Sequence, residues 1–340
     1  MRWRFRRHIF RTLLRIVDWL KAKARAHPMQ GLVKYHGLRD RILRIPYHDS
    51  ISVNVEALWT ETEVEFGEFA DDEFWINGVK ASQQELRRCQ IVLDKVRQLS
   101  GITYRAKVIS VNSLTYSESK GLGFSSSGGA ALAAAAYSAS GLAKERGWDI
   151  TLISRLARLL AGSACKSAVG GYARWYAGVD DQSSYAVQIG DRSTLDLGML
   201  VVPVQSSIRT DVVHEDVTAS PFFEVRVRSA QNRVEEIHRA ILEGDLVRVG
   251  MLAERDTLEL HALIQTGRQG LIVYEPQSLK VIKCVRELRQ EGKAVFFSMQ
   301  TGPSVFVNTY PEDLGYVKSR LLSLGVSVIE SVVGGEVRIL

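Results

Sequence analysis

Several features are missing from this 340-residue chain, and each absence excludes a class of protein. No apolar run approaches the roughly 18 uncharged residues that a membrane-spanning helix needs, so we expect no integral membrane segment. Only three cysteines occur, far apart at Cys89, Cys165 and Cys284; their spacing predicts no metal site and indicates a reducing, cytoplasmic compartment. We find no internal repeat, no linker rich in proline or serine, and no clean apolar core of a secretory signal.

What is present is the composition of a folded domain protein. The chain is 46% hydrophobic and 24% charged, which excludes intrinsic disorder and supplies enough apolar material for two lobes. Its formal charge of +6 is uneven, because residues 1–25 hold nine Lys or Arg against Asp18 and the remaining 315 residues carry a net charge of −2. A body so close to neutral predicts no nucleic-acid partner.

The basic N-terminus itself has helical spacing. Apolar residues recur between arginines over Met1–Lys23, which predicts a basic amphipathic helix. Such a helix could lie on a membrane surface or a partner, or pack on the body as an extra helix. A start codon assigned too early is a third interpretation.

Alternating and helical patterns predict the elements of the body. Strands are predicted at residues 50–55, 62–69, 104–111, 185–189, 198–203, 294–299, 304–308, 326–332 and 336–340. Helices are predicted at residues 82–99, 152–160, 232–263 with a break at Gly244, 278–290 and 312–324. This mixed order predicts an α+β fold of two lobes. We place the domains at residues 24–200 and 201–340, behind an N-terminal extension at residues 1–23.

The most informative local motif is Gly121–Gly129, which reads Gly-Leu-Gly-Phe-Ser-Ser-Ser-Gly-Gly and opens an alanine-rich helix running to about Ala143. Glycines let a backbone approach phosphate oxygens, serine hydroxyls donate hydrogen bonds, and a helix start presents unpaired N–H groups to an anion. The motif is neither a Walker A loop nor a Rossmann fingerprint. A glycine-rich helix start that merely packs closely on a sheet is the alternative.

Several motifs in this order resemble one family. Lys34-Tyr-His-Gly-Leu-Arg-Asp40 with Pro46-Tyr-His-Asp-Ser-Ile-Ser-Val53 is similar to the N-terminal signature of the mevalonate-pathway decarboxylases. The Gly121–Gly128 loop resembles the ATP-phosphate loop of the GHMP kinase superfamily, to which those enzymes belong. Ser163-Ala-Cys-Lys-Ser167 with Gly170-Gly171 and Ser298-Met-Gln-Thr-Gly-Pro-Ser304 resemble two further motifs of the family. The Lys-Tyr-His-Gly form is most similar to archaeal phosphomevalonate decarboxylase.

The resemblance implies a two-lobed GHMP-kinase-like fold with a deep cleft, and a two-stage reaction that uses ATP and Mg²⁺. ATP phosphorylates the tertiary 3-hydroxyl of a 5-phosphorylated mevalonate; phosphate then leaves, carbon dioxide is lost and an isopentenyl phosphate (or diphosphate) forms. All the ligands are anionic, so the cleft needs lysines, arginines and helix starts. Dimers are common in the family, so a homodimer is implied as well.

The resemblance also assigns site residues. The implied catalytic residues are Lys34, Ser163, Lys166 and Gln300. The implied ATP-binding residues are Gly121, Gly123, Ser125, Ser126, Ser127 and Gly128, and the implied substrate-binding residues are Tyr35, His36, Arg209 and Thr210. No protein side chain is assigned as a metal ligand.

Four positions depart from the family pattern. Leu38 stands where the diphosphate-using enzymes carry a second lysine, which favours a monophosphate tail. Phe124 replaces the first serine of the loop, and Lys166 replaces an arginine, keeping the charge without its bidentate fork. Gln300 replaces the aspartate assigned as general base or orienter of the 3-hydroxyl, and glutamine cannot accept a proton. Asp180 and Asp181 could substitute, but their position before a predicted strand is typical of a turn.

Three functions therefore remain open. The first is an ATP-dependent phosphomevalonate decarboxylase. The second is half of that reaction, either a mevalonate 3-kinase or an ATP-independent mevalonate 3,5-bisphosphate decarboxylase. The third is a catalytically degenerate homologue that binds a ligand in the same cleft.

Overall fold

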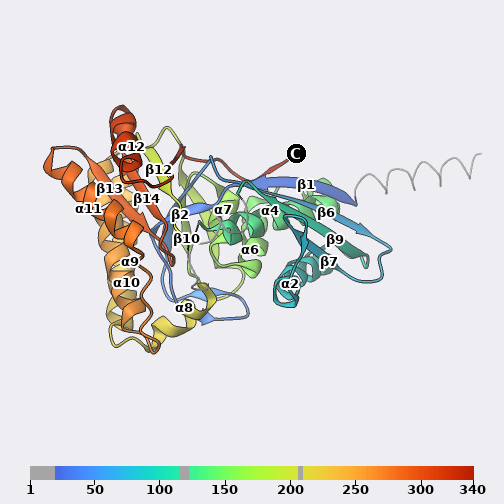
Figure 1. Ribbon diagram of the computed structural model, residues 1–340. Coiled ribbons are helices and arrows are strands. Elements are labelled where there is room, and N and C mark those ends of the chain that lie inside the picture. The colour runs from blue at the N-terminus through green and yellow to red at the C-terminus, as the bar shows by residue number, and fades with distance from the viewer. Residues whose placement is uncertain (1–19, 115–121, 206–209) are drawn as a thin grey trace, which may run out of the picture.

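The computed structural model describes residues 20–114, 122–205 and 210–340 (Figure 1). Most of the predicted N-terminal helix, together with Gly121 and Arg209, lies outside these residues. At its described end the helix prediction is wrong, because Lys21–Ala26 forms strand β1. Every second side chain of β1 carries a positive charge, and these side chains pair with the glutamates of the next strand in the sheet.

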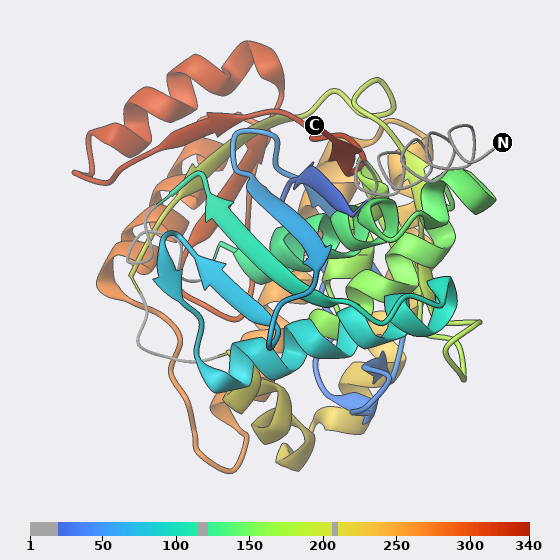
Figure 2. The same ribbon diagram turned by 90° about the vertical axis from the view of Figure 1, so that its right-hand side faces the viewer.

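The first sheet has six strands in the order β16-β1-β6-β9-β7-β8. Its strands are β1, β6 (Thr60–Gly67), β7 (Glu73–Ile76), β8 (Val79–Lys80), β9 (Arg105–Asn112) and β16 (Arg338–Ile339). Strand β6 alternates buried and half-buried residues, the pattern of a strand with one face on a core. One face of this sheet is in view in Figure 2 and the helices lie behind it. The last strand of the chain pairs with the first described one, which ties the C-terminus into this sheet.

An apolar layer of helices covers the inner face of that sheet. It contains α2 (Gln83–Ser100), α4 (Phe124–Ala139), α5 (Leu142–Arg146), α6 (Ile150–Leu160) and α7 (Ala164–Val169). Helix α4 packs on β1, β6, α6 and α7, and its alanine-rich sequence is buried on nearly every side, as expected for a central helix. Helix α4 is therefore the central helix of this layer, and of its first turn Ser125 is exposed.

Two four-stranded sheets form the rest of the framework. The second has the order β11-β10-β5-β2 and contains β2 (Met29–Val33), β5 (Ser50–Asn54), β10 (Tyr172–Tyr176) and β11 (Tyr185–Gly190). The third has the order β13-β14-β12-β15 and contains β12 (Gly198–Val202), β13 (Val295–Met299), β14 (Val305–Thr309) and β15 (Ile329–Ser331). A short hairpin, β3 (Leu38–Asp40) with β4 (Ile45–Pro46), follows β2.

The remaining helices lie mainly with the third sheet. They are α8 (Thr210–Asp216), α9 (Phe223–Leu242), α10 (Leu246–Gln265), α11 (Pro276–Gln290) and α12 (Leu314–Leu322), with short 3₁₀ turns at Val217–Ala219 and Pro311–Asp313. The predicted break at Gly244 is confirmed: this glycine has φ +70° and separates α9 from α10. Both helices also contact β2, so they bring side chains to the segment after that strand.

The α+β prediction is confirmed, and the predicted strands and helices are present with shifted ends. Three differences matter for the site. The serines predicted in a loop lie inside the first turn of α4, and the glycine-bounded segment after residue 162 contains helix α7 rather than a plain break. Strands β2 and β10, which flank the site, were not predicted. The domain boundary near residue 200 stays a prediction.

Candidate active site

Lys34 follows β2 directly and is buried despite its charge, with 4% of its surface exposed. Its Nζ donates to Thr257 Oγ1 at 2.8 Å and Ala253 O at 3.3 Å, and it lies 3.6 Å from Asp256 Oδ2. Burial lowers the pKa of Lys34 to about 8, while the Asp256 carboxylate opposes the shift. Three acceptors on α10 therefore hold the end of this lysine.

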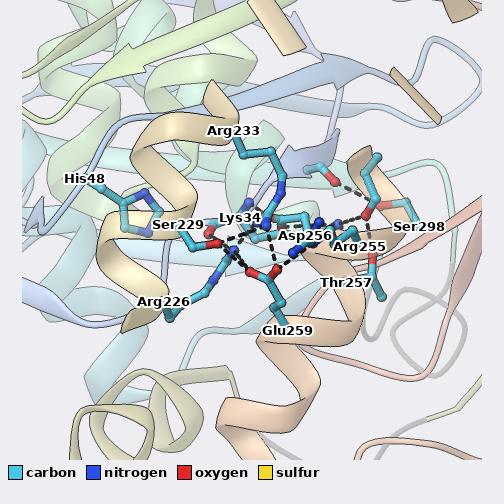
Figure 3. Close-up of polar contacts among 12 residues, drawn as sticks. Lys34, His48, Arg226, Ser229, Arg233, Arg255, Asp256, Thr257, Glu259 and Ser298 are labelled. Atoms are coloured by element: carbon cyan, nitrogen blue, oxygen red, sulfur yellow. Dashed lines mark hydrogen bonds and ion pairs between the residues drawn. The ribbon is translucent and has the colours of Figure 1, made fainter. Parts of the chain in front are cut away.

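Asp256 is the centre of a buried ion-pair network between α9 and α10 (Figure 3). Its Oδ2 accepts the backbone N–H of Lys34 at 3.0 Å, and its Oδ1 lies 2.7 Å from Arg226 Nη2 and 3.1 Å from Arg233 Nη1. Glu259 pairs with both arginines from the outer side of the network. Burial alone would raise the pKa of Asp256, but the surrounding cations outweigh it and hold the pKa at about 2. This carboxylate therefore holds a negative charge and is a poor proton acceptor.

Tyr35 joins the segment after β2 to the start of α7. Its hydroxyl oxygen accepts the backbone N–H of Ser163 at 3.1 Å, and its ring meets the Trp175 ring edge-on at 4.7 Å. Burial raises the pKa of Tyr35 to about 12, so the phenol stays protonated. Of the predicted site residues, Tyr35 and Ser163 are thus in direct contact.

His36 lies in a group of imidazoles beside Tyr35. Its ring stacks on His214 at 4.5 Å with an interplanar angle of 15°, and its Nε2 lies 3.0 Å from Thr301 Oγ1. Burial, together with the neighbouring imidazoles and Arg226, lowers the pKa of His36 well below its ordinary value. A neutral His36 can orient a ligand by hydrogen bonding but carries no charge for a phosphate.

Lys166 is the second buried lysine, with 1% of its surface exposed. It lies in α7, its Nζ donates to Ser50 Oγ at 2.8 Å, and the Tyr35 and Trp175 rings lie 5.6 and 6.0 Å away. Burial lowers the pKa of Lys166 to about 8. Within the described part of the chain no carboxylate forms an ion pair with it, so an anionic ligand would stabilise its charge.

The start of α4 is built to meet an anion through its backbone. Gly123 is the N-cap residue with φ +81°, and no side chain caps this helix of 16 residues. The first N–H groups of a helix have no acceptor within it. Ser125 is exposed in the first turn, and a Cβ added at Gly128 would meet nothing within 4 Å. Gly128 therefore leaves open space at this helix start, next to the exposed Ser125.

The other two serines of the motif point inward. Ser126 Oγ donates to Gly123 O at 2.7 Å and accepts from Ser167 Oγ at 2.9 Å, while Ser127 Oγ lies 2.7 Å from Thr60 Oγ1. Both serine side chains are fully buried. Their hydroxyls thus fasten α4 to α7 and β6, and the phosphate contacts predicted for these two residues stay a prediction.

Gln300 lies next to the same helix start. Its Nε2 donates to Met29 O at 2.9 Å, and a Cβ added at Gly123 would lie 3.4 Å from that nitrogen. His261 Nε2 lies 2.8 Å from Gln300 O, and burial lowers the pKa of this imidazole to about 4, so it donates to the carbonyl in its neutral form. The side-chain amide of Gln300 is therefore held as a hydrogen-bond donor to Met29, the first residue of β2.

The structure brings most of the predicted site residues together through direct contacts and leaves three undecided. Gly121 and Arg209 lie outside the described residues, and Thr210 is described only as the first residue of α8. The turn at Asp180 and Asp181 is confirmed: Asp180 accepts from Ser183, and Asp181 pairs with Arg158 and Arg155. Neither carboxylate is therefore free to take the role of the missing aspartate.

The sequence analysis missed the polar face of α10. Asp256, Thr257 and His261 are fully buried in the predicted helix, at positions where its periodicity calls for apolar residues. Polar residues on the core face of an amphipathic helix are the signal that could have found them. Of the two arginines that pair with Asp256, Arg233 also lies on the buried face of the predicted helix, whereas Arg226 lies before its predicted start at residue 232.

Comparisons with known proteins show the family of the chain. Residues 26–186 match the diphosphomevalonate decarboxylase-like N-terminal domain. Phosphomevalonate decarboxylase of Haloferax volcanii is 35% identical over 94% of this chain and 98% of its own length. Mevalonate 3,5-bisphosphate decarboxylase of Thermoplasma acidophilum is 26% identical over 86% of this chain and 71% of its own length.

Two solved structures extend the comparison over the whole fold. Mevalonate diphosphate decarboxylase from Staphylococcus aureus superposes with a TM-score of 0.87 at 31% identity, covering 94% of this chain and 98% of that one. MDDEF in complex with MVAPP, AMPPCP and magnesium gives the same TM-score at 30% identity, covering 94% and 99%. The fold and these relatives thus define an enzyme of the GHMP kinase superfamily. Within it, the chain belongs to the mevalonate-pathway decarboxylases, which are carboxy-lyases.

Proposed function

We propose that this chain catalyses the ATP-dependent decarboxylation of 5-phosphomevalonate to isopentenyl phosphate. The observation that carries the proposal is the pair of buried lysines, Lys34 and Lys166, together with the start of α4, which no side chain caps. The contacts of Tyr35 with both lysine-bearing segments, and of Ser126 with α7, join these parts into one site. Buried ammonium groups and a helix start suit phosphates and a carboxylate.

The start of α4 fits the nucleotide. Gly128 leaves room for phosphate oxygens, and a helix start that no side chain caps offers backbone N–H groups to an anion. The described residues hold no group of three His, Cys, Asp or Glu side chains that could bind a metal ion. A Mg²⁺ at this site would be bound mainly by the nucleotide phosphates and water. Mg-ATP supplies the phosphoryl group.

The chain's own residues account for the other steps. Lys166 and the start of α7 at Ser163 hold the substrate carboxylate, and Lys34 offsets the negative charge that develops as the 3-hydroxyl is phosphorylated. When the C3–O bond breaks and phosphate leaves, the electrons of the C1–C2 bond form the new double bond and CO₂ departs. Lys166 supplies the positive charge that holds this carboxylate, without the bidentate fork that an arginine would provide.

Leu38 indicates that the substrate carries a monophosphate, rather than a diphosphate, at its 5-position. This residue is half-buried and packs against the cluster that contains Tyr35 and Trp175, where a second lysine would serve a diphosphate. A charge-assisted contact to phosphate is worth about 1.5–3 kcal/mol, so its loss corresponds to about a tenfold to hundredfold preference for the monophosphate.

Gln300 favours a second candidate function. Its amide is tied to Met29 O and cannot take a proton, so the chain could perform half of the reaction. It would then act as a mevalonate 3-kinase, or decarboxylate mevalonate 3,5-bisphosphate without ATP, the activity named for the Thermoplasma relative. A degenerate homologue that only binds its ligand is the remaining alternative.

One assay separates these functions. Pure protein is incubated with Mg-ATP and each of mevalonate, its 5-phosphate, its 5-diphosphate and its 3,5-bisphosphate, and ADP and CO₂ are measured separately. The proposal expects equal amounts of ADP and CO₂, with the highest kcat/KM on the 5-phosphate. ADP without CO₂ would identify a 3-kinase, CO₂ from the 3,5-bisphosphate alone an ATP-independent decarboxylase, and neither product a ligand-binding homologue.

The assembly and location are part of the same proposal. Within the described residues, no helix has the length and apolarity that crossing a bilayer demands. We infer a homodimer in the cytoplasm. Light scattering during size-exclusion chromatography measures the assembly directly, and a mass of one chain would contradict it.

A further inference from the structure

Lys34 is held by two helices that follow it by about 200 residues in the chain (Figure 3). Asp256 on α10 accepts its backbone N–H at 3.0 Å and lies 3.6 Å from its ammonium nitrogen. Arg226 on α9 donates to the Lys34 carbonyl oxygen at 3.1 Å and is itself paired with Asp256 at 2.7 Å. The Asp256 carboxylate thus holds Lys34 in three ways. It accepts the backbone N–H, it pairs with the arginine that donates to the backbone carbonyl, and it lies close to the side-chain ammonium group.

The charges of this cluster do not cancel. Lys34, Arg226 and Arg233 carry three positive charges, each on a side chain at least 95% buried, against Asp256 and the less buried Glu259. The cluster therefore keeps one excess positive charge out of contact with water. Other titratable groups also act on this cluster: Arg255 pairs with Glu259 from the exposed side, and Lys166 and three imidazoles, His36, His48 and His261, interact with its members. Burial lowers the pKa of His48 and of His261 to about 4 and that of His36 well below its ordinary value, so all three are neutral at physiological pH.

Two simpler roles for Asp256 do not fit its contacts. A general base needs a free oxygen and a pKa near the working pH, but both oxygens are engaged by cations and the pKa is held at about 2. A purely structural ion pair would need no contact with the segment that carries a ligand-facing lysine. Asp256 makes that contact twice, at the backbone and at the ammonium group.

We propose that Asp256 is a positioning residue for the decarboxylation: from α10 it fixes both the backbone and the ammonium group of Lys34 against the anionic substrate. This inference rests on the proposed function, because that function makes the phosphorylated mevalonate the ligand of Lys34. Asp256 itself touches no reacting atom and acts through Lys34. Removing its charge leaves Lys34 among Arg226 and Arg233 without a counter-ion, so Lys34 should both shift and lose its proton more easily.

The test measures Lys34 directly in the full chain. Protein labelled with [ε-¹³C]lysine is titrated by NMR, and the Lys34 signal is assigned by its loss in Lys34→Arg. In the ligand-free protein we expect Lys34 to titrate near pH 8, and in Asp256→Asn at least about one pH unit lower. In parallel, kcat/KM for CO₂ release at pH 7 should fall about 10²-fold, since a misplacement of about 1 Å can cost that much. The alkaline limb of the pH–rate profile should move with the NMR titration.

Glu259→Gln is the matched control, because Glu259 pairs with the same two arginines and, among the described residues, makes no ion pair or hydrogen bond with Lys34. It should shift the Lys34 titration less and cost several times less activity. If Asp256→Asn does not fold, Asp256→Asn with Arg233→Gln restores the net charge of the cluster and still removes the anchor. A folded variant that lacks Asp256 and keeps the wild-type titration and rate would overturn the proposal. A wild type that releases no CO₂ would instead refute the proposed function, while the ligand-free titration would still report on the anchor.

Discussion

At the scale of single residues, Gln300 offers the sharpest test of the chemistry. Gln300→Asp removes the amide held by Met29 O and places a carboxylate beside the start of α4, where negative charge is favourable. A positioned general base contributes about 10²–10⁴-fold, so we expect ATP-coupled CO₂ release from 5-phosphomevalonate to rise by at least about tenfold. The measurement is the initial rate of CO₂ release at saturating Mg-ATP.

Gln300→Asn is the matched control, because it also shortens the side chain but cannot take a proton. It should give no increase. If Gln300→Asp alone does not raise the rate of CO₂ release, we add Lys166→Arg, which restores bidentate binding of the substrate carboxylate. The double variant should then show the increase in rate. An unchanged rate in both variants, with a wild type of ordinary activity, would mean that glutamine suffices.

Lys166 illustrates how a ligand site costs stability. Its folded pKa of about 8 lies below the ordinary value of 10.5, so between these values the unfolded chain binds the extra proton. The contribution of Lys166 to stability therefore improves as pH rises through that window, and below pH 8 the buried ammonium costs about 3 kcal/mol. Replacing Lys166 by an apolar residue removes that cost but also removes its hydrogen bond to Ser50, which is worth about 1 kcal/mol of stability.

We therefore expect Lys166→Met to raise the free energy of unfolding by about 2 kcal/mol at pH 7 while abolishing CO₂ release. The difference from the wild type should shrink toward pH 10. Urea unfolding at the two pH values measures both effects. Lys80→Met, on the exposed strand β8, should change stability by less than about 0.5 kcal/mol. A Lys166→Met variant less stable than the wild type at pH 7 would contradict this account.

At the scale of elements, α7 depends on a segment far away in the chain. It has six residues, too few to be stable alone, and it carries Lys166. The C-terminal segment holds it: Val337 N donates to Ala168 O at 3.0 Å, and Gly171 N donates to Gly334 O at 2.8 Å. The sequence analysis predicted no helix here, because the segment that holds it lies more than 160 residues downstream.

This anchoring predicts an unusual cost at Gly170. The residue has φ +69° and ψ −177°, and an added Cβ would lie 2.2 Å from the backbone nitrogen of Glu336. Gly147 has nearly the same backbone angles, φ +77° and ψ −174°, but a Cβ there would meet nothing within 4 Å. The two glycines therefore share the conformational strain and differ in the clash.

Gly147→Ala should lose about 1–3 kcal/mol of unfolding free energy, the cost of a side chain in that backbone region. Gly170→Ala should lose a further 1–3 kcal/mol or so, because the C-terminal segment must move. It should also lower kcat, since α7 positions Lys166, whereas Gly147→Ala should not. Urea unfolding and CO₂ release measure the two effects, and equal losses in both variants would show that the C-terminal contact does not matter.

At the scale of the whole molecule, the sequence predicted what is encoded locally. Strand β6 alternates and α2 has a capping box at Ser82, so both were found with small errors at their ends. Strand β2 was missed because it is buried on both faces and interrupted by Gln30 and Gly31, which leaves no period to detect.

The site divides in the same way. Lys34, Lys166 and Gln300 were predicted as site residues because each lies in a motif that resembles one of the family's. The anchor of Lys34 could not be found, because Asp256 follows it by 222 residues and Arg226 by 192. No pattern in the sequence pairs residues so far apart.

The basic N-terminus raises the last question at this scale. Deleting residues 1–19 removes six arginines and Asp18 and lowers the net charge from +6 to +1. Strand β1 begins at Lys21, so every described strand and helix remains in the shortened chain. We therefore expect kcat/KM for CO₂ release within about twofold of the full chain, and earlier elution from a cation-exchange column.

Deleting residues 1–26 is the matched control, because it removes β1 from between β6 and β16 and should unfold the first sheet. A tenfold loss of kcat/KM on deletion of residues 1–19 alone would place that segment in the reaction. Binding to anionic vesicles that is lost on deletion would assign it to a membrane surface, to which each Lys or Arg contributes about 1 kcal/mol.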